Sequence, residues 1–443
     1  MASRRDPMPE PLMGWALLCL ALLCAFPLGG HRPALWMLQT SASFLACGVL
    51  LIAAAARGSR FPAGPGNGGR EDLQGLLGLS LTWALCLVVF QVLPATGLVP
   101  WIQAHDPASS LIGAFRLLGT LAFGLACLQA FRRRHRAGLA ALALLFGMVL
   151  HAAYGFVGLR LESWVLPGEN AYPGFLTGAF VNRNSFATYL GIAIVLCMAL
   201  LCSPLPWRKT RSEGADTMMW RACFSVLACF LIAGLLATGS RMGLVATIIG
   251  LGALGIGIAY GGKGRRKYGL LLLLPALPLP LILVMGNDPL LDRMLDLGEN
   301  TEARIALYRA TLRMISDSPW LGVGLDNFSE MFREYQDLSV SPDLRWNDAH
   351  STYLENWSEL GLIVGSLPIL IGGLTVIHLL RRIRLSGGRD ALSLAAMAGL
   401  IVGAVHTAVD FSLEIQGVLL PLILLIVLAL SPAPQTTENE VTA

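Results

Sequence analysis

Long apolar runs recur along almost the whole chain, from Leu12 to Leu430, and short polar segments separate them. A helix needs about 20 apolar residues to cross the hydrocarbon of a bilayer, and most of these runs approach that length. The pattern therefore predicts an all-α polytopic membrane protein of about 12 transmembrane helices. The predicted spans are 12–30, 34–56, 73–93, 109–131, 138–159, 185–202, 218–237, 243–260, 269–285, 358–380, 391–408 and 415–431.

The composition supports this reading. Of the 443 residues, 55% are hydrophobic and only 14% are charged, which is too apolar for an ordinary soluble domain. We interpret residues 1–443 as a single membrane domain. The nine cysteines lie in or beside apolar runs without metal-binding spacing, so we expect them to be small core residues and expect no metal site or cofactor.

Basic residues fall in clusters in alternate loops, which is typical of the cytoplasmic side of an inner-membrane protein. The pattern predicts cytoplasmic termini and makes 286–357, between the ninth and tenth spans, one long periplasmic loop with short helices. Because the formal net charge of +4 comes from these clusters, we expect membrane lipids and no nucleic acid as partners. The clusters are Arg57, Arg60 and Arg70; Arg132, Arg133, Arg134 and Arg136; Arg208, Lys209 and Arg211; Lys263, Arg265, Arg266 and Lys267; and Arg381, Arg382, Arg384 and Arg389.

The remaining basic residues are arginines that lie outside or within a span, against the charge bias. A guanidinium stays charged and presents a planar fork of donors, which suits phosphate or pyrophosphate. For any single arginine the alternative is that its side chain reaches lipid headgroups or pairs with a carboxylate. These residues are Arg32, Arg116, Arg160, Arg183, Arg241, Arg293, Arg304, Arg309, Arg313, Arg333 and Arg345.

Within the long loop, residues 301–316 have helical periodicity. The apolar stripe predicted there consists of Ile305, Tyr308, Leu312 and Ile315. Arg304 borders the stripe on one side, and Arg309 and Arg313 border it on the other. Because Arg309 and Arg313 are four residues apart, they repel each other on a helix unless an anion or a carboxylate lies between them.

His350 closes the same loop. It precedes a predicted helix start, where Thr352 and Glu355 have the spacing of a capping box. The positive end of a helix disfavours imidazolium, so a histidine there tends to stay neutral and can act as a general base. The alternative is a loop histidine that satisfies one hydrogen bond. Glu355 and Glu359 either orient a substrate hydroxyl, hold an arginine or cap the helix.

Shorter outer segments add candidate residues. Arg183 lies between Asn182 and Asn184 at the start of the sixth span, and Arg241 lies at the tip of a hairpin. Arg116 lies within the fourth span, where a charge is costly unless it faces the interior. His406 is followed four residues later by Asp410, a pair that either braces the site or packs between helices.

These segments resemble the O-antigen ligase and polymerase superfamily of bacterial membrane glycosyltransferases. The resemblance covers about residues 178–415 and rests on FVNRNSFATYL, ATGSRMGL, the run from ARIALYRATLRMISDSPWLGVGLDNF to AHSTYLENWSELGLIVG, and HTAVDFSLEI.

The resemblance implies transfer of a glycan from an undecaprenyl-pyrophosphate-linked donor to a hydroxyl on the periplasmic side, without a metal and with inversion. It further implies that His350 is the general base and that Arg183, Arg241, Arg304 and Arg309 bind the pyrophosphate. Possible supporting residues are Arg116, Asn182, Asn184, Glu355 and Asp410.

Members of the superfamily differ in their acceptor. A ligase uses lipid A core sugar, a polymerase uses another lipid-linked repeat, and an O-oligosaccharyltransferase uses a protein side chain. We expect the ligase, with the polymerase as the main alternative. A transporter of lipid-linked sugar is a further alternative, but it should carry intramembrane charges in both halves of the bilayer, and apart from Arg116 the spans hold almost none.

Overall fold

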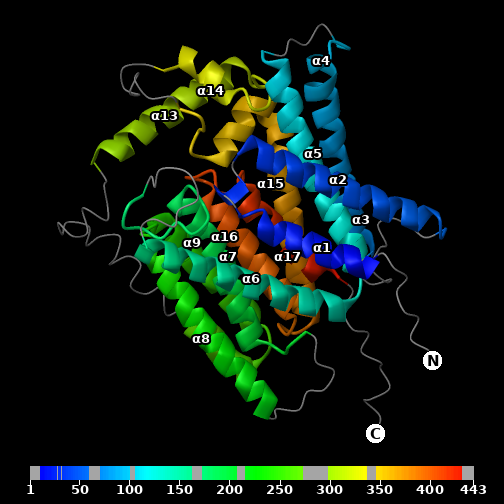
Figure 1. The fold of residues 1–443 in the computed structure, drawn as a ribbon, viewed down its shortest axis with the longest axis vertical. Coiled ribbons are helices and arrows are strands. Elements are labelled where there is room, and N and C mark those ends of the chain that lie inside the picture. Colours follow the sequence, from blue (N-terminus) through cyan, green and yellow to red (C-terminus); the bar gives the residue numbers. More distant parts are fainter. Residues whose placement is uncertain are drawn as a thin grey trace.

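The computed structural model describes residues 10–26, 28–30, 32–58, 70–99, 105–161, 172–206, 215–272, 298–336 and 346–431, and within them every regular element is a helix. Figure 1 shows their arrangement. The helices are α1 (Glu10–Leu23), α2 (Pro33–Ala55), α3 (Arg70–Leu87), α4 (Leu93–Ala95), α5 (Pro107–Ala130), α6 (Arg134–Leu161), α7 (Arg183–Cys202), α8 (Ala215–Ala237), α9 (Arg241–Ala259), α10 (Lys263–Leu271), α13 (Gly298–Asp317), α14 (Phe328–Met331), α15 (Thr352–Leu385), α16 (Ala391–His406) and α17 (Gln416–Leu430), with short turns η1 (Leu28–Gly30), η2 (Val88–Val92) and η4 (Phe332–Glu334).

The helices fall where the apolar runs predict them. Eight are long and apolar enough to cross a membrane, and α1, α16 and α17 are shorter apolar helices. Together they coincide with every predicted span except 269–285, most of which lies outside the described residues. The chain is therefore a polytopic helical membrane protein, whereas the number of twelve spans stays a prediction.

Helix α7 forms the centre of the bundle and packs against α6, α8, α9, α16 and α17. In the apolar stretch of α7, 83% of the residues are buried, the largest share among the candidate spans. Small residues allow this packing, because a Cβ added at Gly191 would lie 2.5 Å from Thr247 of α9. A central helix of this kind holds its first residues in a defined position.

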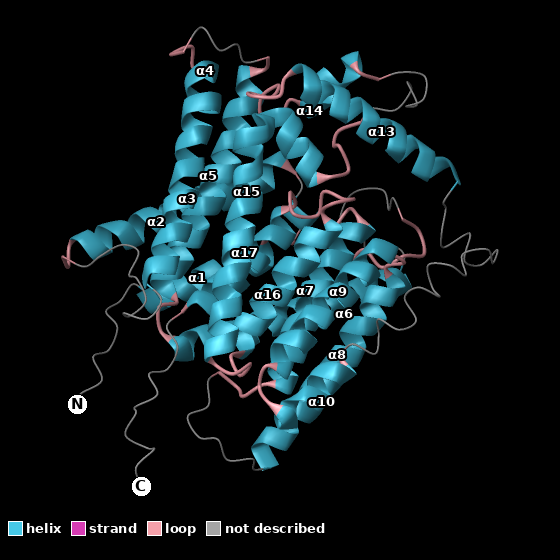
Figure 2. Ribbon diagram, turned by 180° about the vertical axis from the view of Figure 1, so that it is seen from behind, coloured by secondary structure: helices cyan, strands magenta, loops and turns pink. Residues whose placement is uncertain are grey.

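Ion pairs join several loops that the sequence assigns to the cytoplasm. The buried Glu10 pairs with Arg57 and Arg132, and Asp390 pairs with Arg134. Helix α10, from another of these loops, lies at the opposite end of the molecule from α13 and α14 (Figure 2). The assignment of either end to a side of the membrane stays a prediction.

Helix α13 packs against α15 and has a small apolar core of its own. The predicted stripe was wrong in part: Leu307, Ala310 and Met314 are fully buried, whereas Ile305 is 44% and Leu312 53% exposed. The buried face uses alanines that a stripe of large side chains overlooks. The result leaves Arg304 half-buried at the edge of this face.

Helix α15 is interrupted at Gly361, whose φ of 74° is left-handed. The segment before α14 fills this break through backbone hydrogen bonds: Leu362 N donates to Pro319 O at 2.8 Å and Val323 N to Ser358 O at 2.9 Å. A Cβ at Gly361 would lie 2.2 Å from the carbonyl oxygen of Trp320, so only glycine permits this contact. The contact attaches the outer segment to the first turns of α15.

Candidate active site

His350 lies two residues before α15 in a left-handed conformation, with φ of 50°. Its carbonyl accepts a hydrogen bond from Tyr308 Oη of α13 at 3.1 Å. Its ring packs against Phe411 and Trp346, with centroids 5.4 Å and 5.9 Å away. The imidazole Nδ1 is buried and has no hydrogen-bond partner among the described residues, so it is available to a substrate.

The surroundings of His350 favour the neutral imidazole. Burial, with the positive charge of Arg304 beside it, lowers the pKa of His350 to about 4. From the sequence we expected the positive end of α15 to keep His350 neutral. In the structure the causes are burial of the ring and the positive charge of Arg304. At neutral pH the ring can therefore accept a proton.

The capping box predicted at this helix start was wrong. The N-cap of α15 is Ser351, and its side chain makes no capping hydrogen bond. Glu355 instead accepts a hydrogen bond from Ala349 N at 2.8 Å, on the side of the loop that leads to His350. Glu355 thus holds the backbone next to His350.

Asp410 lies in the loop between α16 and α17 and links the bundle to this site. Its carboxylate accepts a hydrogen bond from the side chain of Ser412 and lies near Asn184 and Arg304. Burial raises the pKa of Asp410 to about 6, although the polar side chains of Ser412 and Asn184 and the charge of Arg304 act in the opposite direction. His406 packs between helices, with Nδ1 2.5 Å from Thr188 Oγ1 of α7.

Arg183 and Arg241 begin α7 and α9, after the N-caps Asn182 and Ser240. The Arg183 guanidinium stacks on the ring of Phe175 at 4.3 Å. A Cβ at Gly239 would lie 3.1 Å from Arg183 Nη1, so the hairpin that carries Arg241 packs directly against Arg183. Both helix starts direct the positive ends of their dipoles to this region, which favours an anion.

Electrostatic effects link several of the predicted residues. Asp410 lies near Asn184, the residue after Arg183, and the positive charge of Arg304 acts on both Asp410 and His350. Arg309 differs, because its side chain is exposed on α13. The structure thus groups the segments of Arg183, Arg304 and His350, and leaves Arg309 at the surface.

Arg116 lies in acidic surroundings. Its Nη2 is 2.6 Å from Asp326 Oδ1, and its guanidinium lies over the Trp36 ring at 5.6 Å. With 23% of its side chain exposed, Arg116 faces into the protein as the sequence predicts. Its partner Asp326 occupies a left-handed conformation with φ of 56°.

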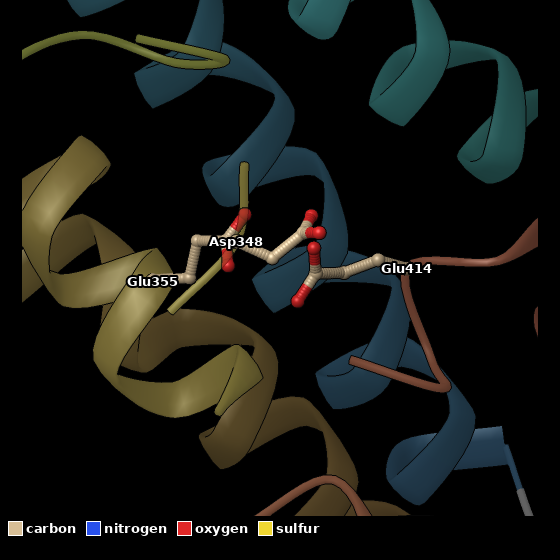
Figure 3. A group of neighbouring side chains, drawn as sticks. All are labelled: Asp348, Glu355 and Glu414. Carbon is tan, nitrogen blue, oxygen red and sulfur yellow. The ribbon is translucent and has the colours of Figure 1, made fainter. Parts of the chain in front are cut away.

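Beside Arg116 lies a cluster of three carboxylates, Asp348, Glu355 and Glu414 (Figure 3). One oxygen from each lies within 4.8 Å of the others. Asp348 and Glu414 were not among the residues predicted from the sequence. In the sequence each of these residues is a single carboxylate near the end of an apolar run. That pattern does not show that the three carboxylates lie together in the fold.

The helices and this site define a polytopic membrane protein with a buried polar centre at one end of its bundle. A family model described as O-antigen ligase matches residues 224–369, which confirms the resemblance to the O-antigen ligase and polymerase superfamily. The match includes Arg241, Arg304 and His350 and supports an activity of the ligase or polymerase type, acting on lipid-linked glycans. A search of curated proteins gave no match.

Proposed function

We propose that the protein is a metal-independent glycosyltransferase of the bacterial inner membrane that transfers an undecaprenyl-pyrophosphate-linked O-antigen glycan to a hydroxyl of lipid A core oligosaccharide on the periplasmic side. The observation that carries the proposal is the half-buried ring of His350, whose Nδ1 has no hydrogen-bond partner among the described residues and which lies within the influence of the Arg304 charge. The transfer requires a proton acceptor for the acceptor hydroxyl and a fixed positive charge for the leaving pyrophosphate.

In the proposed reaction His350 takes the proton of the acceptor hydroxyl while that oxygen attacks the anomeric carbon. The bond from this carbon to the pyrophosphate oxygen breaks, and its electron pair leaves with the pyrophosphate. Arg304, Arg183 and Arg241 stabilise the charge that develops on the leaving group. Direct displacement inverts the anomeric configuration.

We propose weaker roles for the other residues. Arg309, exposed on α13, would attract the pyrophosphate as the lipid approaches. Asn182 would hold the start of α7 by accepting a hydrogen bond from Asn184 N, and the Asn184 side chain would support the nearby Asp410. Glu355 would keep the His350 backbone in place through Ala349, while Arg116 would support the neighbouring acidic cluster.

The second candidate function is polymerisation of O-antigen or exopolysaccharide repeats, because the same base and arginines serve any hydroxyl acceptor. Transfer to a protein side chain is a further possibility of the same chemistry. Transport of lipid-linked sugar is less well supported, since apart from Arg116 the spans hold almost no charged residue.

The test is glycan transfer by purified protein in detergent, with an undecaprenyl-pyrophosphate-linked oligosaccharide as donor. Parallel reactions contain lipid A core or a second donor molecule as acceptor. Product with lipid A core alone supports the ligase, and product with the second donor alone supports the polymerase. Folded wild-type protein that gives neither product contradicts the proposal.

A further inference from the structure

The carboxylates of Asp348, Glu355 and Glu414 point toward one another from three separate segments: the loop before α15, α15 itself and the loop before α17 (Figure 3). Glu355 is buried and the other two are half-buried. Three acidic groups this close repel strongly in surroundings of low dielectric constant. Their charge therefore needs compensation by protons or by a cation.

The charged side chains around the three carboxylates do not neutralise their negative charge. Arg116 is the one basic side chain described on the same cavity, and it is 2.6 Å from a further carboxylate, Asp326. Glu359, one turn along α15, is also acidic and accepts a hydrogen bond from Phe328 N at 3.0 Å. Each added carboxylate increases the need for a cation.

A second, independent feature points into the same space. Asp348 and Glu414 line a cavity of about 40 Å³ together with Gln416, the first residue of α17. Gln416 is only 3% exposed, and its Oε1 accepts no hydrogen bond from any described residue. A shared proton between Glu355 and Glu414 would leave this oxygen unsatisfied. A cation with its water ligands would satisfy it.

We propose that Asp348, Glu355, Glu414 and Gln416 form a Ca²⁺ site. Carboxylate and amide oxygens are the ligands that Ca²⁺ prefers, at about 2.3–2.6 Å, so two ligands of one ion lie at most about 5 Å apart. The carboxylate oxygens lie within 4.8 Å of one another, which agrees with this limit. Mg²⁺, with ligands at about 2.0–2.1 Å, needs a tighter group of oxygens and a stricter octahedral geometry than Ca²⁺ does.

The ion would join the loop that carries His350 to α15 and to the loop before α17. Asp348 is two residues from His350, and Phe411, which packs on the His350 ring, lines the cavity. The ion is thus a structural one, and the transfer step proposed above does not use it. The inference stands whether or not that activity is found.

Terbium luminescence tests the site, because Tb³⁺ replaces Ca²⁺ and is excited by energy transfer from a nearby tryptophan. Trp36 lines the same cavity. For purified wild-type protein stripped with a chelator, we expect tryptophan-excited Tb³⁺ emission that Ca²⁺ displaces, with a dissociation constant of about 10⁻⁴–10⁻³ M. We also expect Ca²⁺ to raise the unfolding temperature.

Three variants separate the outcomes. Trp36→Phe should lower the emission, with Trp346 near Asp348 supplying the remainder, but keep the Ca²⁺-dependent rise in unfolding temperature. Glu414→Gln should lose both, and Glu330→Gln, on the exposed side of α14, should keep both. Wild-type protein that shows neither Ca²⁺-displaceable emission nor a shift in unfolding temperature would overturn the proposal and indicate carboxylates that share protons. An unchanged Ca²⁺ response in folded Glu414→Gln would do the same.

Discussion

His350 illustrates how a single residue acquires its chemistry from its surroundings. In the free protein, burial and Arg304 hold its pKa at about 4, which makes the imidazole a weak base. A bound pyrophosphate would place negative charge beside Arg304 and so oppose part of this effect. We therefore expect the donor to make His350 more basic at the moment when a base is needed.

The pH dependence of transfer should reveal this change. The acid limb of kcat/KM reports the free enzyme and should fall at about pH 4, whereas the acid limb of kcat reports the complex and should lie at higher pH. Initial rates across the acidic range, at low and saturating donor, measure both limbs. If kcat falls at the same pH as kcat/KM, or at a lower pH, the donor does not raise the pKa of His350 through Arg304.

Arg304→Gln should raise the pKa of His350. A positive neighbour disfavours imidazolium, so its removal makes protonation easier and moves the pKa from about 4 toward the ordinary histidine value, although burial still lowers it. Titration of isotope-labelled histidine by NMR measures the change, and the spectrum of His350→Gln assigns the signal.

The matched control for this titration is Arg333→Gln, which removes an exposed arginine paired with Glu330 and should leave the His350 pKa unchanged. If Arg304→Gln and Arg333→Gln have the same effect, the Arg304 charge does not act on His350.

At the scale of elements, the break in α15 is the feature that attaches the outer segment to the bundle. Gly361 and Gly322 meet there backbone to backbone, and a Cβ at Gly322 would lie 2.3 Å from the carbonyl oxygen of Glu359. The part of α15 before this break carries Glu355 and follows His350. The geometry of the candidate site therefore depends on this contact.

Gly361→Ala should destabilise the protein by about 1–3 kcal/mol from its backbone alone, because φ of 74° with ψ of 168° is a conformation that essentially only glycine adopts, with more from the clash with Trp320. Gly372→Ala is the matched control in the same helix, because a Cβ there meets no described atom within 4 Å and alanine favours a helix. Thermal unfolding in detergent measures both. Equal unfolding temperatures for the two variants would argue against the break.

For the whole molecule, the helices were the most predictable feature. A span must be long and apolar to cross the hydrocarbon, so hydropathy alone located runs such as 185–202 and 391–408 within a few residues of α7 and α16. The buried face of α13 was less predictable, because this helix packs on protein through small residues such as Ala310.

The candidate site could be predicted only in part. His350 and the arginines stand out because charged or titratable residues are rare between apolar runs. Their grouping depends on how distant segments pack: Asn184 lies near Asp410 across the bundle, and Asp348 meets Glu414 through tertiary structure alone. No local pattern encodes such contacts, so the acidic cluster was missed.

In the proposed reaction His350 performs the proton transfer while the arginines hold the pyrophosphate. Single-turnover transfer with labelled donor and saturating acceptor separates these two roles when wild type is compared with a His350→Ala variant of unchanged unfolding temperature. We predict that His350→Ala lowers the rate at saturating donor by about 10²–10⁴-fold and leaves the donor dissociation constant nearly unchanged. A His350→Ala variant that transfers at the wild-type rate would contradict the role of His350 as the general base.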